Sequence, residues 1–473
     1  MNQKYYITTT LPYVNADPHI GFALEITAAD VLARFHRDIL HEEVIFNTGT
    51  DEHGQKIHQN AAAAGKDTQA YVDEYAVAFS QLKELLSLEF THFIRTTNPE
   101  HKKAAQAFWV ACRENGDIYK KMYTLSYCVG CELEKQSSEL VDGKCPLHPT
   151  KEIEVREEEN YFFAFSKYQE LLLNHYQKHP DFVEPEGKQK EITAFVAGGL
   201  SDFSISRLKA KMPWGVPVPD DDDHVMYVWF DALVNYISTL GWPQTDSTFT
   251  SFWPGVQVAG KDNLRQQAAM WQAMLASAGI PLSKKILING FISVAGQKMS
   301  KSLGNVIAPS EMVDRYGCDA TRYLLMELGP FGTDMDVTWE KLDTTYTAHL
   351  SNGIGNVCSR IAKMCEKNGA ALSVSQPPLT KEYKTSLENY HITEAIASIQ
   401  AVVTDIDHYL SSTKPWKQSG QAQTDILVPA VEKVLLLASM LVPFMPKTAA
   451  IILNHFTQQQ ISALTPLFPR VTN

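Results

Sequence analysis

Residues 5–21 read YYITTTLPYVNADPHIG. The run up to residue 10 is aromatic or β-branched, which is typical of a β-strand, and it breaks at Pro12. Pro18 precedes a long stretch with apolar residues at helical spacing, so we expect a helix to begin near His19. The segment therefore predicts a strand, a turn and a helix at the start of the fold.

The alternation of strands and helices continues beyond this segment. The sequence predicts a strand at residues 43–47, a helix at about 68–86 and further strands at 225–230 and 286–288. This alternation implies a Rossmann-like parallel sheet with its ligand site at the carboxyl ends of the strands. Asp51 and His53 follow the strand at 43–47, and we expect them at that edge.

Two segments depart from this pattern. Residues 115–224 contain a cysteine cluster and end in a Pro-rich stretch, which is typical of an insertion. Beyond about residue 341, apolar residues recur at helical spacing with no strand between them, which predicts a helical bundle. The expected fold class is α/β, with a parallel sheet split by a zinc-knuckle insertion and followed by an all-α domain. The expected domains are residues 1–114 and 225–340 for the two halves of the Rossmann-like domain, 115–224 for the insertion and 341–473 for the helical domain.

Composition limits the possible functions. The chain has 473 residues and a formal charge of −12, which argues against a protein that binds polyanions with its whole surface. Any nucleic-acid contact is therefore expected at local basic patches. The N-terminus lacks the apolar stretch of a signal peptide, and no apolar run is long enough to span a membrane, so we expect no membrane contact and a cytoplasmic location.

Four residues have the spacing of a metal site. Cys128 and Cys131 form one C-x₂-C pair, and Cys145 and His148 form a C-x₂-H pair a short distance later. Three thiolates and one imidazole complete a tetrahedral Zn²⁺ shell with no open position. The cluster therefore predicts a structural zinc site.

Two motifs have the chemistry of a site that binds ATP. His19 and Gly21 stand at a predicted helix start, where glycine allows close approach of phosphate or adenine, the helix N-terminus favours anions and histidine can donate a hydrogen bond. Lys298 and Lys301 lie on a loop bounded by glycines, from which two cations can close over a triphosphate. Alone, the tripeptide around Ile20 is weak evidence for an ATP site. The loop with the two lysines strengthens that evidence.

With both motifs in this order around the cysteine cluster, the chain resembles the class I aminoacyl-tRNA synthetases and, from end to end, the methionyl-tRNA synthetase family. The matching segments are residues 11–15, 48–54, 93–97, 202–207, 227–232 and 260–262. The resemblance implies that the chain activates methionine with ATP and Mg²⁺ to an aminoacyl-adenylate and transfers it to tRNA. It also implies a HIGH-type motif at residues 18–21 and a KMSKS loop at 298–302.

The resemblance assigns roles to individual positions. The implied catalytic residues are His19, Gly21, Lys298 and Lys301. Those implied for ATP are Glu25, Gly260, Asp262 and Lys301. The implied amino-acid pocket comprises Tyr13, Asp51, Trp229, Ala232, Leu233, Tyr236, Asn263 and Gln267. Anticodon reading is implied for Asn356, Arg360 and Trp416. These roles suit the residue types, because a carboxylate can pair with the substrate ammonium and a Trp can stack on an unpaired base.

The sequence departs from the family at three positions. Phe22 replaces the second histidine of the first motif, Asn263 replaces an apolar residue of the pocket wall, and Gln267 replaces a pocket histidine. An unpaired amide facing a thioether costs about 1–3 kcal/mol, whereas a polar substrate could pair with it.

A second hypothesis stays open beside a methionine–tRNA ligase, namely a paralogue that adenylates a more polar amino acid for an acceptor outside translation. If Gln267 instead repacks, the pocket still admits methionine. A non-catalytic tRNA-binding protein is disfavoured by the presence of His19, Asp51 and both loop lysines. Since no further module follows the helical segment, we expect a monomer.

Overall fold

The computed structural model describes residues 3–131, 133–135, 140–244, 247–299 and 305–470. Its centre is a six-stranded parallel sheet with the order β3-β2-β1-β12-β13-β7. The strands are β1 (Lys4–Thr9), β2 (Glu43–Thr50), β3 (His92–Arg95), β7 (Val183–Glu184), β12 (Val256–Gly260) and β13 (Lys285–Asn289). The strand order reverses between β1 and β12, which is where open α/β sheets bind ligands.

Helix α1 (Ile20–Arg34) follows β1 as expected and continues into the π-helical turn η1 (Phe35–Ile39). Nearly all of its side chains are buried, because α1 packs between the sheet and helix α13 (Cys318–Glu327). Four more helices belong to this first part of the chain: α2 (Gln55–Ala63), α3 (Thr68–Ser80), α4 (Leu82–Leu85) and α5 (Pro99–Glu114). The helix expected at about 68–86 is thus present as α3 and α4.

The segment expected as an insertion contains two antiparallel sheets. A four-stranded sheet has the order β5-β4-β6-β8, and a three-stranded sheet has the order β10-β11-β9. Their strands are β4 (Ile118–Cys128), β5 (Leu133–Glu134), β6 (Glu154–Phe163), β8 (Phe203–Ser204), β9 (Ser206–Leu208), β10 (Pro217–Val218) and β11 (Asp221–Met226). The helices are η3 (Phe165–Tyr168), α6 (Gln169–Lys178) and α7 (Glu186–Ala197). The short strand β7 lies in the same segment but joins the edge of the central sheet.

One predicted strand is wrong. Residues 225–230 do not resume the central sheet, because β11 ends at Met226 in the antiparallel sheet and α8 (Val228–Ala232) is helical. A short apolar run has no period that separates a strand from a buried helix. The elements that follow are α9 (Asn235–Ser238), α10 (Ser247–Phe252), η4 (Lys261–Asn263), η5 (Gln266–Met270) and α11 (Trp271–Ser277).

A third small sheet flanks the loop that carries the lysines. Its order is β15-β14-β16, formed by β14 (Ile292–Val294), β15 (Gln297–Lys298) and β16 (Met335–Val337). Helices α12 (Pro309–Tyr316) and α13 lie between β15 and β16 in the sequence. Lys298 therefore ends a strand, whereas Lys301 lies outside the described residues.

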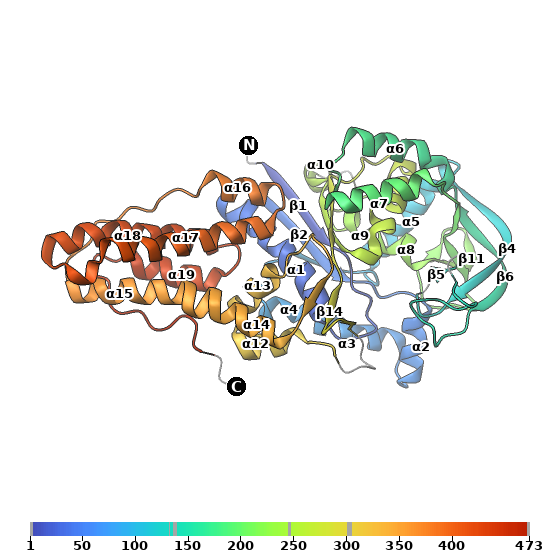
Figure 1. The fold of residues 1–473 in the computed structure, drawn as a ribbon. Coiled ribbons are helices and arrows are strands. Elements are labelled where there is room, and N and C mark those ends of the chain that lie inside the picture. The colour runs from blue at the N-terminus through green and yellow to red at the C-terminus, as the bar shows by residue number, and fades with distance from the viewer. Residues whose placement is uncertain (1–2, 132, 136–139, 245–246, 300–304, 471–473) are drawn as a thin grey trace.

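From Trp339 on, the described residues form helices and the segments that connect them, and no strand is found among them. This part comprises α14 (Trp339–Thr345), η7 (Tyr346–Gly355), α15 (Asn356–Asn368), α16 (Lys381–Glu388), α17 (Ile392–Thr413), η8 (Pro415–Lys417), α18 (Gly420–Leu441) and α19 (Pro446–Phe456). Figure 1 shows this bundle extending from one side of the central sheet, with β4 and β6 at the opposite end. The expected fold class is confirmed. Of the helices described, none combines the length and the apolar character needed to cross a membrane.

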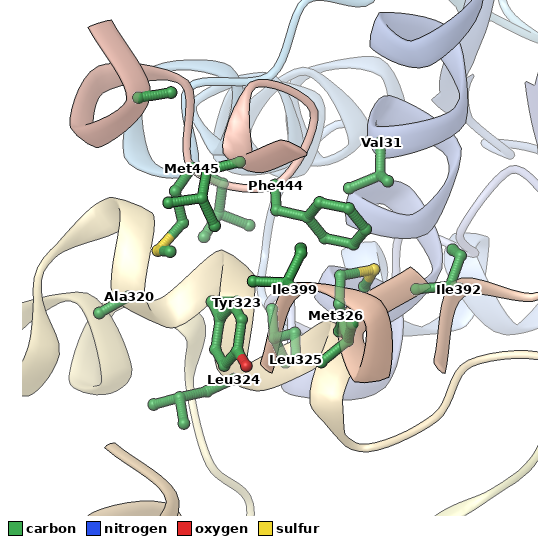
Figure 2. Close-up of a cluster of buried hydrophobic side chains, with 14 of the residues drawn as sticks. Val31, Ala320, Tyr323, Leu324, Leu325, Met326, Ile392, Ile399, Phe444 and Met445 are labelled. Atoms are coloured by element: carbon green, nitrogen blue, oxygen red, sulfur yellow. The ribbon is translucent and has the colours of Figure 1, made fainter. Parts of the chain in front are cut away.

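The bundle is joined to the sheet region through a continuous apolar core. Figure 2 shows Val31 of α1, Met326 of α13, Ile399 of α17 and Phe444 together at this junction. The fully buried Arg322 adds a polar link, with its guanidinium 2.8 Å from Asp30 and hydrogen bonds to three main-chain carbonyls. Since Asp30 lies on α1, the helix that is capped by His19 also anchors the bundle.

Candidate active site

A cavity of about 640 Å³ opens at the carboxyl ends of β1, β12 and β13. Its lining includes Thr10, His19, Glu25, Gly260 and Asn289. These residues come from segments far apart in the sequence and meet at the point where the strand order reverses. The cavity therefore lies where the sheet topology predicts a ligand.

His19 caps the first turn of α1. Its Nδ1 accepts a hydrogen bond of 3.0 Å from the main-chain N–H of Gly21. Partial burial lowers the pKa of His19, although the nearby Asp262 opposes this shift. A neutral ring whose Nδ1 accepts must carry its proton on Nε2, so His19 retains one N–H that can donate to an anion.

Gly21 is constrained by its neighbours. A Cβ atom at this position would lie 2.9 Å from Cε1 of His19, so a larger residue would displace the imidazole. The same Cβ position lies 3.8 Å from Cε of Met299, which belongs to the KMSKS-type segment. The two predicted motifs therefore approach each other at one wall of the cavity.

Glu25 lies buried in the same cavity. Its Oε1 accepts hydrogen bonds from the N–H and the hydroxyl of Thr10, at 2.9 and 2.5 Å. Burial raises the pKa of Glu25 to about 8, against the effect of the Thr10 hydrogen bonds and with a contribution from Asp262. Glu25 therefore carries a proton at neutral pH and can donate it to a hydroxyl group of a ligand.

A second, smaller cavity of about 20 Å³ continues from the first. It brings together most of the residues expected around the amino acid, namely Asp51, Trp229, Ala232, Leu233, Tyr236, Asn263 and Gln267. Tyr13 lines the larger cavity, and its backbone forms an isolated parallel β-bridge with that of Asp51. Asp51, Trp229 and Asn263 line both cavities, so the two form one cleft.

Gln267 is not an unpaired amide, contrary to the concern raised by the sequence. Its Nε2 donates to Oη of Tyr236 at 2.7 Å, and its Oε1 accepts from Nε2 of Gln257 at 3.1 Å. Both partners are buried protein groups, so this amide does not require a polar substrate. The energetic argument for a polar amino acid fails at this position.

Of the other two departures, Phe22 has a local explanation, and nothing in the structure explains Asn263. The ring of Phe22 is buried and packs edge-on against Phe79, with 5.4 Å between the ring centroids, so it acts as a core residue at the cavity wall. Asn263 ends the short helix η4 and precedes the π-helical turn η5, which contains Gln267. Single π-helical turns occur frequently at functional sites.

The predicted metal ligands are brought together. The side-chain donor atoms of Cys128, Cys131, Cys145 and His148 all lie within 4.8 Å of one another. Separations such as 3.3 Å between the Cys131 and Cys145 sulfurs and 3.9 Å between Cys128 and Nδ1 of His148 match a tetrahedral shell, whose ligands lie about 3.8 Å apart. Three sulfurs and one nitrogen at this spacing fit Zn²⁺. Gly130 and Cys131 also line the larger cavity, so the cluster adjoins it.

The residues expected to read an anticodon lie in the bundle. Asn356 begins α15 and is exposed, and the Trp416 side chain in η8 is 50% exposed. Arg360 pairs with Asp407 of α17 at 2.7 Å, and both side chains are partly exposed.

Sequence reasoning missed several polar groups of the cleft. Asn289 ends β13 and lines the larger cavity, and both atoms of its buried amide lack a hydrogen-bond partner among the described residues. Gln257, Gln272 and Ser283 form a buried network behind the smaller cavity. A polar residue directly after the apolar strand at 286–288 was the available signal for Asn289. No local signal identifies the network.

Comparison with known proteins gives a consistent result. The family model for class I tRNA synthetases (M) matches residues 5–152 and 131–362. The chain is 42% identical to the methionine–tRNA ligase of Thermotoga maritima over 94% of this chain and 74% of the relative. It is 40% identical to that of Thermosynechococcus vestitus, over 94% of this chain and 89% of the relative.

A solved structure agrees with these sequence relatives. Mycobacterium tuberculosis methionyl-tRNA synthetase in complex with methionyl-adenylate superposes with a TM-score of 0.92 at 35% identity. The match covers 99% of this chain and 100% of the other. The resemblance noted from the motifs is confirmed over nearly the whole chain.

Proposed function

The chain belongs to the methionine–tRNA ligase family of class I tRNA synthetases, and we propose that it activates methionine with ATP and transfers it to tRNA. One observation carries this proposal: a single cleft joins the pocket of Tyr236 to the nucleotide cavity of His19. Asp51 lies where the two meet. An amino acid held there has its carboxylate directed toward the α-phosphate of a nucleotide beside His19.

The chemistry needs no covalent nucleophile from the protein. The substrate carboxylate attacks the α-phosphorus of ATP and displaces pyrophosphate, whose charge a Mg²⁺ ion bound with the nucleotide would help to stabilise. In this proposal Asp51 pairs with the substrate ammonium, and Nε2–H of His19 donates to a phosphate oxygen. Lys298 and Lys301 supply positive charge to the departing pyrophosphate, while Glu25, Gly260 and Asp262 hold the ribose. A terminal hydroxyl of tRNA then attacks the acyl carbon and releases AMP.

Under this proposal the methionine side chain points from the larger cavity toward the smaller one, whose wall includes Trp229, Leu233 and Tyr236. Because the Gln267 amide is already paired, it does not impose the desolvation penalty expected from an unpaired group. The relatives' names support methionine, and no observation favours the more polar amino acid.

Pyrophosphate exchange tests the substrate directly. Each proteinogenic amino acid is supplied alone to the protein, and the exchange of pyrophosphate into ATP is measured. We expect exchange when methionine is supplied. Exchange with a polar amino acid but not with methionine would contradict the proposal. Exchange with methionine alone would exclude the paralogue hypothesis.

The transfer step is tested at Trp416. If its ring stacks on an anticodon base, Trp416→Ala should lower the kcat/KM of aminoacylation by about 10–100-fold, because stacking contributes about 1–3 kcal/mol per base. Pyrophosphate exchange should stay unchanged. The matched control is Ile451→Ala, which truncates another half-exposed apolar side chain in the bundle. Equal losses in both assays would argue against anticodon reading by Trp416.

Structural zinc forms part of the same proposal. Cys128, Cys131, Cys145 and His148 would hold Zn²⁺, which would cross-link the loops beside the cavity without taking part in the reaction. A monomeric enzyme in the cytoplasm, where tRNA is charged, completes the proposal. Metal analysis and sedimentation of the purified protein test the zinc content and the monomer.

A further inference from the structure

Asp231 is a fully buried carboxylate on α8, the short helix that also carries Trp229 and Ala232 of the pocket wall. It does not itself line either cavity. Burial acts to raise the pKa of Asp231, but His53 and His101 together hold it below its usual value, so the group is charged at neutral pH. A buried charge is costly unless it is paired, so this carboxylate depends on its neighbours.

The two oxygens of Asp231 are held unequally. Oδ2 lies 3.0 Å from Nδ1 of His53 and accepts a hydrogen bond from it, since a carboxylate can only accept. Oδ1 lies 3.6 Å from Nε2 of His101 on α5, which is longer than a hydrogen bond. Neither of these two atoms has a hydrogen-bond partner among the described residues. The contact with His53 is therefore the one that fixes the carboxylate.

His53 belongs to a tightly held loop that also carries Asp51. Between them lies Glu52, whose buried carboxylate accepts hydrogen bonds of 2.6 and 2.9 Å from Arg95. The main-chain carbonyl of Glu52 accepts from Nε1 of Trp214 at 2.5 Å. Because Glu52 is fixed through both its side chain and its main chain, the residues on either side of it move together. A group that holds His53 therefore also holds Asp51.

Helix α8 lies on the other side of this contact and is anchored by apolar packing. Phe230, the residue before Asp231, packs against Phe108 and Trp109 of α5, with ring centroids 5.9 and 5.2 Å apart. Apolar burial is largely non-directional, so it keeps α8 in the core without fixing the loop that faces the helix. The hydrogen bond to Asp231 supplies that fixed direction.

We propose that Asp231 is a positioning residue, whose hydrogen bond with His53 sets the separation of Asp51 and Trp229, two walls of the amino-acid site. The inference rests on the proposed function, in which Asp51 pairs with the substrate ammonium. A ligand that contacts both walls gains from a fixed separation, because the walls need no ordering when it binds. A ligand that contacts only the wall of Trp229 gains nothing from it.

Two alcohols that cannot be activated provide the test. L-Methioninol keeps the ammonium and the side chain of methionine, and 4-(methylthio)butan-1-ol is the same alcohol without the amino group. Each inhibition constant is measured against methionine in pyrophosphate exchange, and the ratio of the second constant to the first gives the contribution of the ammonium. We expect this ratio to fall about tenfold in Asp231→Leu, because the ion pair with Asp51 is misdirected. A purely structural defect would lower kcat and leave the ratio unchanged.

Further variants keep the test decisive, since Asp231→Leu leaves His53 without its partner and lowers stability. Asp231→Asn retains an oxygen that accepts from His53 and should restore the ratio to within about threefold of the wild-type value. His53→Leu combined with Asp231→Leu replaces both partners with apolar groups, so it should recover stability and keep the lowered ratio. The matched control is His36→Gln, which alters a buried histidine paired with Glu42 outside the cleft and should leave the ratio unchanged.

The possible outcomes separate the two proposals. Exchange with methionine and an unchanged ratio in both Asp231→Leu and the double variant would overturn the positioning role and leave the proposed function standing. Recovery of the ratio together with stability in the double variant would show a merely structural role and would also overturn it. Absence of methionine exchange in the wild-type protein would overturn the proposed function. The positioning role would then be judged by the same variants with the alcohol of the amino acid that is activated and its counterpart without the amino group.

Discussion

The two ends of the cleft differ in whether their buried polar groups have hydrogen-bond partners within the protein. At the side-chain end, Gln257 and Gln267 are paired within the protein. At the nucleotide end, the amide of Asn289 has no partner among the described residues, and His19, whose Nδ1 is occupied by the N–H of Gly21, lines the cavity. Paired groups fix an orientation before the substrate arrives, whereas unpaired groups obtain their partner from the ligand. Substitutions should therefore affect stability at one end and catalysis or binding at the other.

The largest effect is expected at His19. Replacing it with Ala removes the Nε2–H that donates to a phosphate oxygen as charge develops there, so kcat for pyrophosphate exchange should fall by about 10²–10³-fold. The loss of the helix cap should lower the free energy of unfolding by only about 1 kcal/mol. Denaturant unfolding separates the two effects. A fall in kcat below tenfold would show that the nucleotide end does not depend on this donor.

A large effect on stability is expected at the side-chain end. Gln257→Leu leaves Oε1 of Gln267 and the hydroxyl of Ser283 without their partners, so the free energy of unfolding should fall by about 1–3 kcal/mol. Urea titration followed by circular dichroism measures this change. KM for ATP should be unaffected. Unchanged stability would mean that the buried network behind the smaller cavity does not contribute to folding.

The corresponding change at the nucleotide end is Asn289→Leu. It removes two buried polar atoms that have no protein partner, so the free energy of unfolding should stay the same or rise. KM for ATP should increase about tenfold, because one hydrogen bond to the ligand is lost. Comparing this variant with Gln257→Leu in both assays tests the contrast directly. A loss of stability with normal ATP binding would reverse it.

The smallest effect is expected from the titration of Glu25. Burial raises its pKa from 4.5 to about 8, so the folded protein holds a proton that the unfolded chain releases. The stability of the folded state therefore falls as the pH rises from 4.5 to 8. Above pH 8 the new charge lies near Asp262 and the triphosphate, so KM for ATP should rise about threefold between pH 7 and 9. Glu25→Gln should abolish this rise, and kinetics in matched buffers measure both proteins.

Much of the fold could be predicted because local signals agreed with the tertiary structure. The strand at residues 5–10 and the helix near His19 have unambiguous periods and a clear cap. The cysteine spacing likewise predicted a cluster that the fold assembles. The apolar run at 225–230 misled because its short length fits either a strand or a helix, and only packing decides between them.

In the candidate site, too, local sequence signals could not reveal contacts between distant segments. The motif residues could be assigned from the sequence, but the state of Gln267 could not. Its partners are Gln257 and Tyr236, and Gln257 in turn accepts a hydrogen bond from the hydroxyl of Ser283. Hydrogen-bond direction arises only when distant segments meet. The sequence therefore revealed an unusual residue but not whether its amide was paired.

The order of the central sheet has a consequence for synthesis on the ribosome. Strand β1 pairs on one side with β2, which emerges soon after it, and on the other with β12, which begins only at Val256. Until then one edge of a hydrophobic parallel sheet lacks its neighbour, and such edges are prone to aggregate. The antiparallel sheets at residues 118–226 can form from local pairs during this interval. The nascent chain therefore has a period in which a chaperone that shields β1 would increase the yield of folded protein.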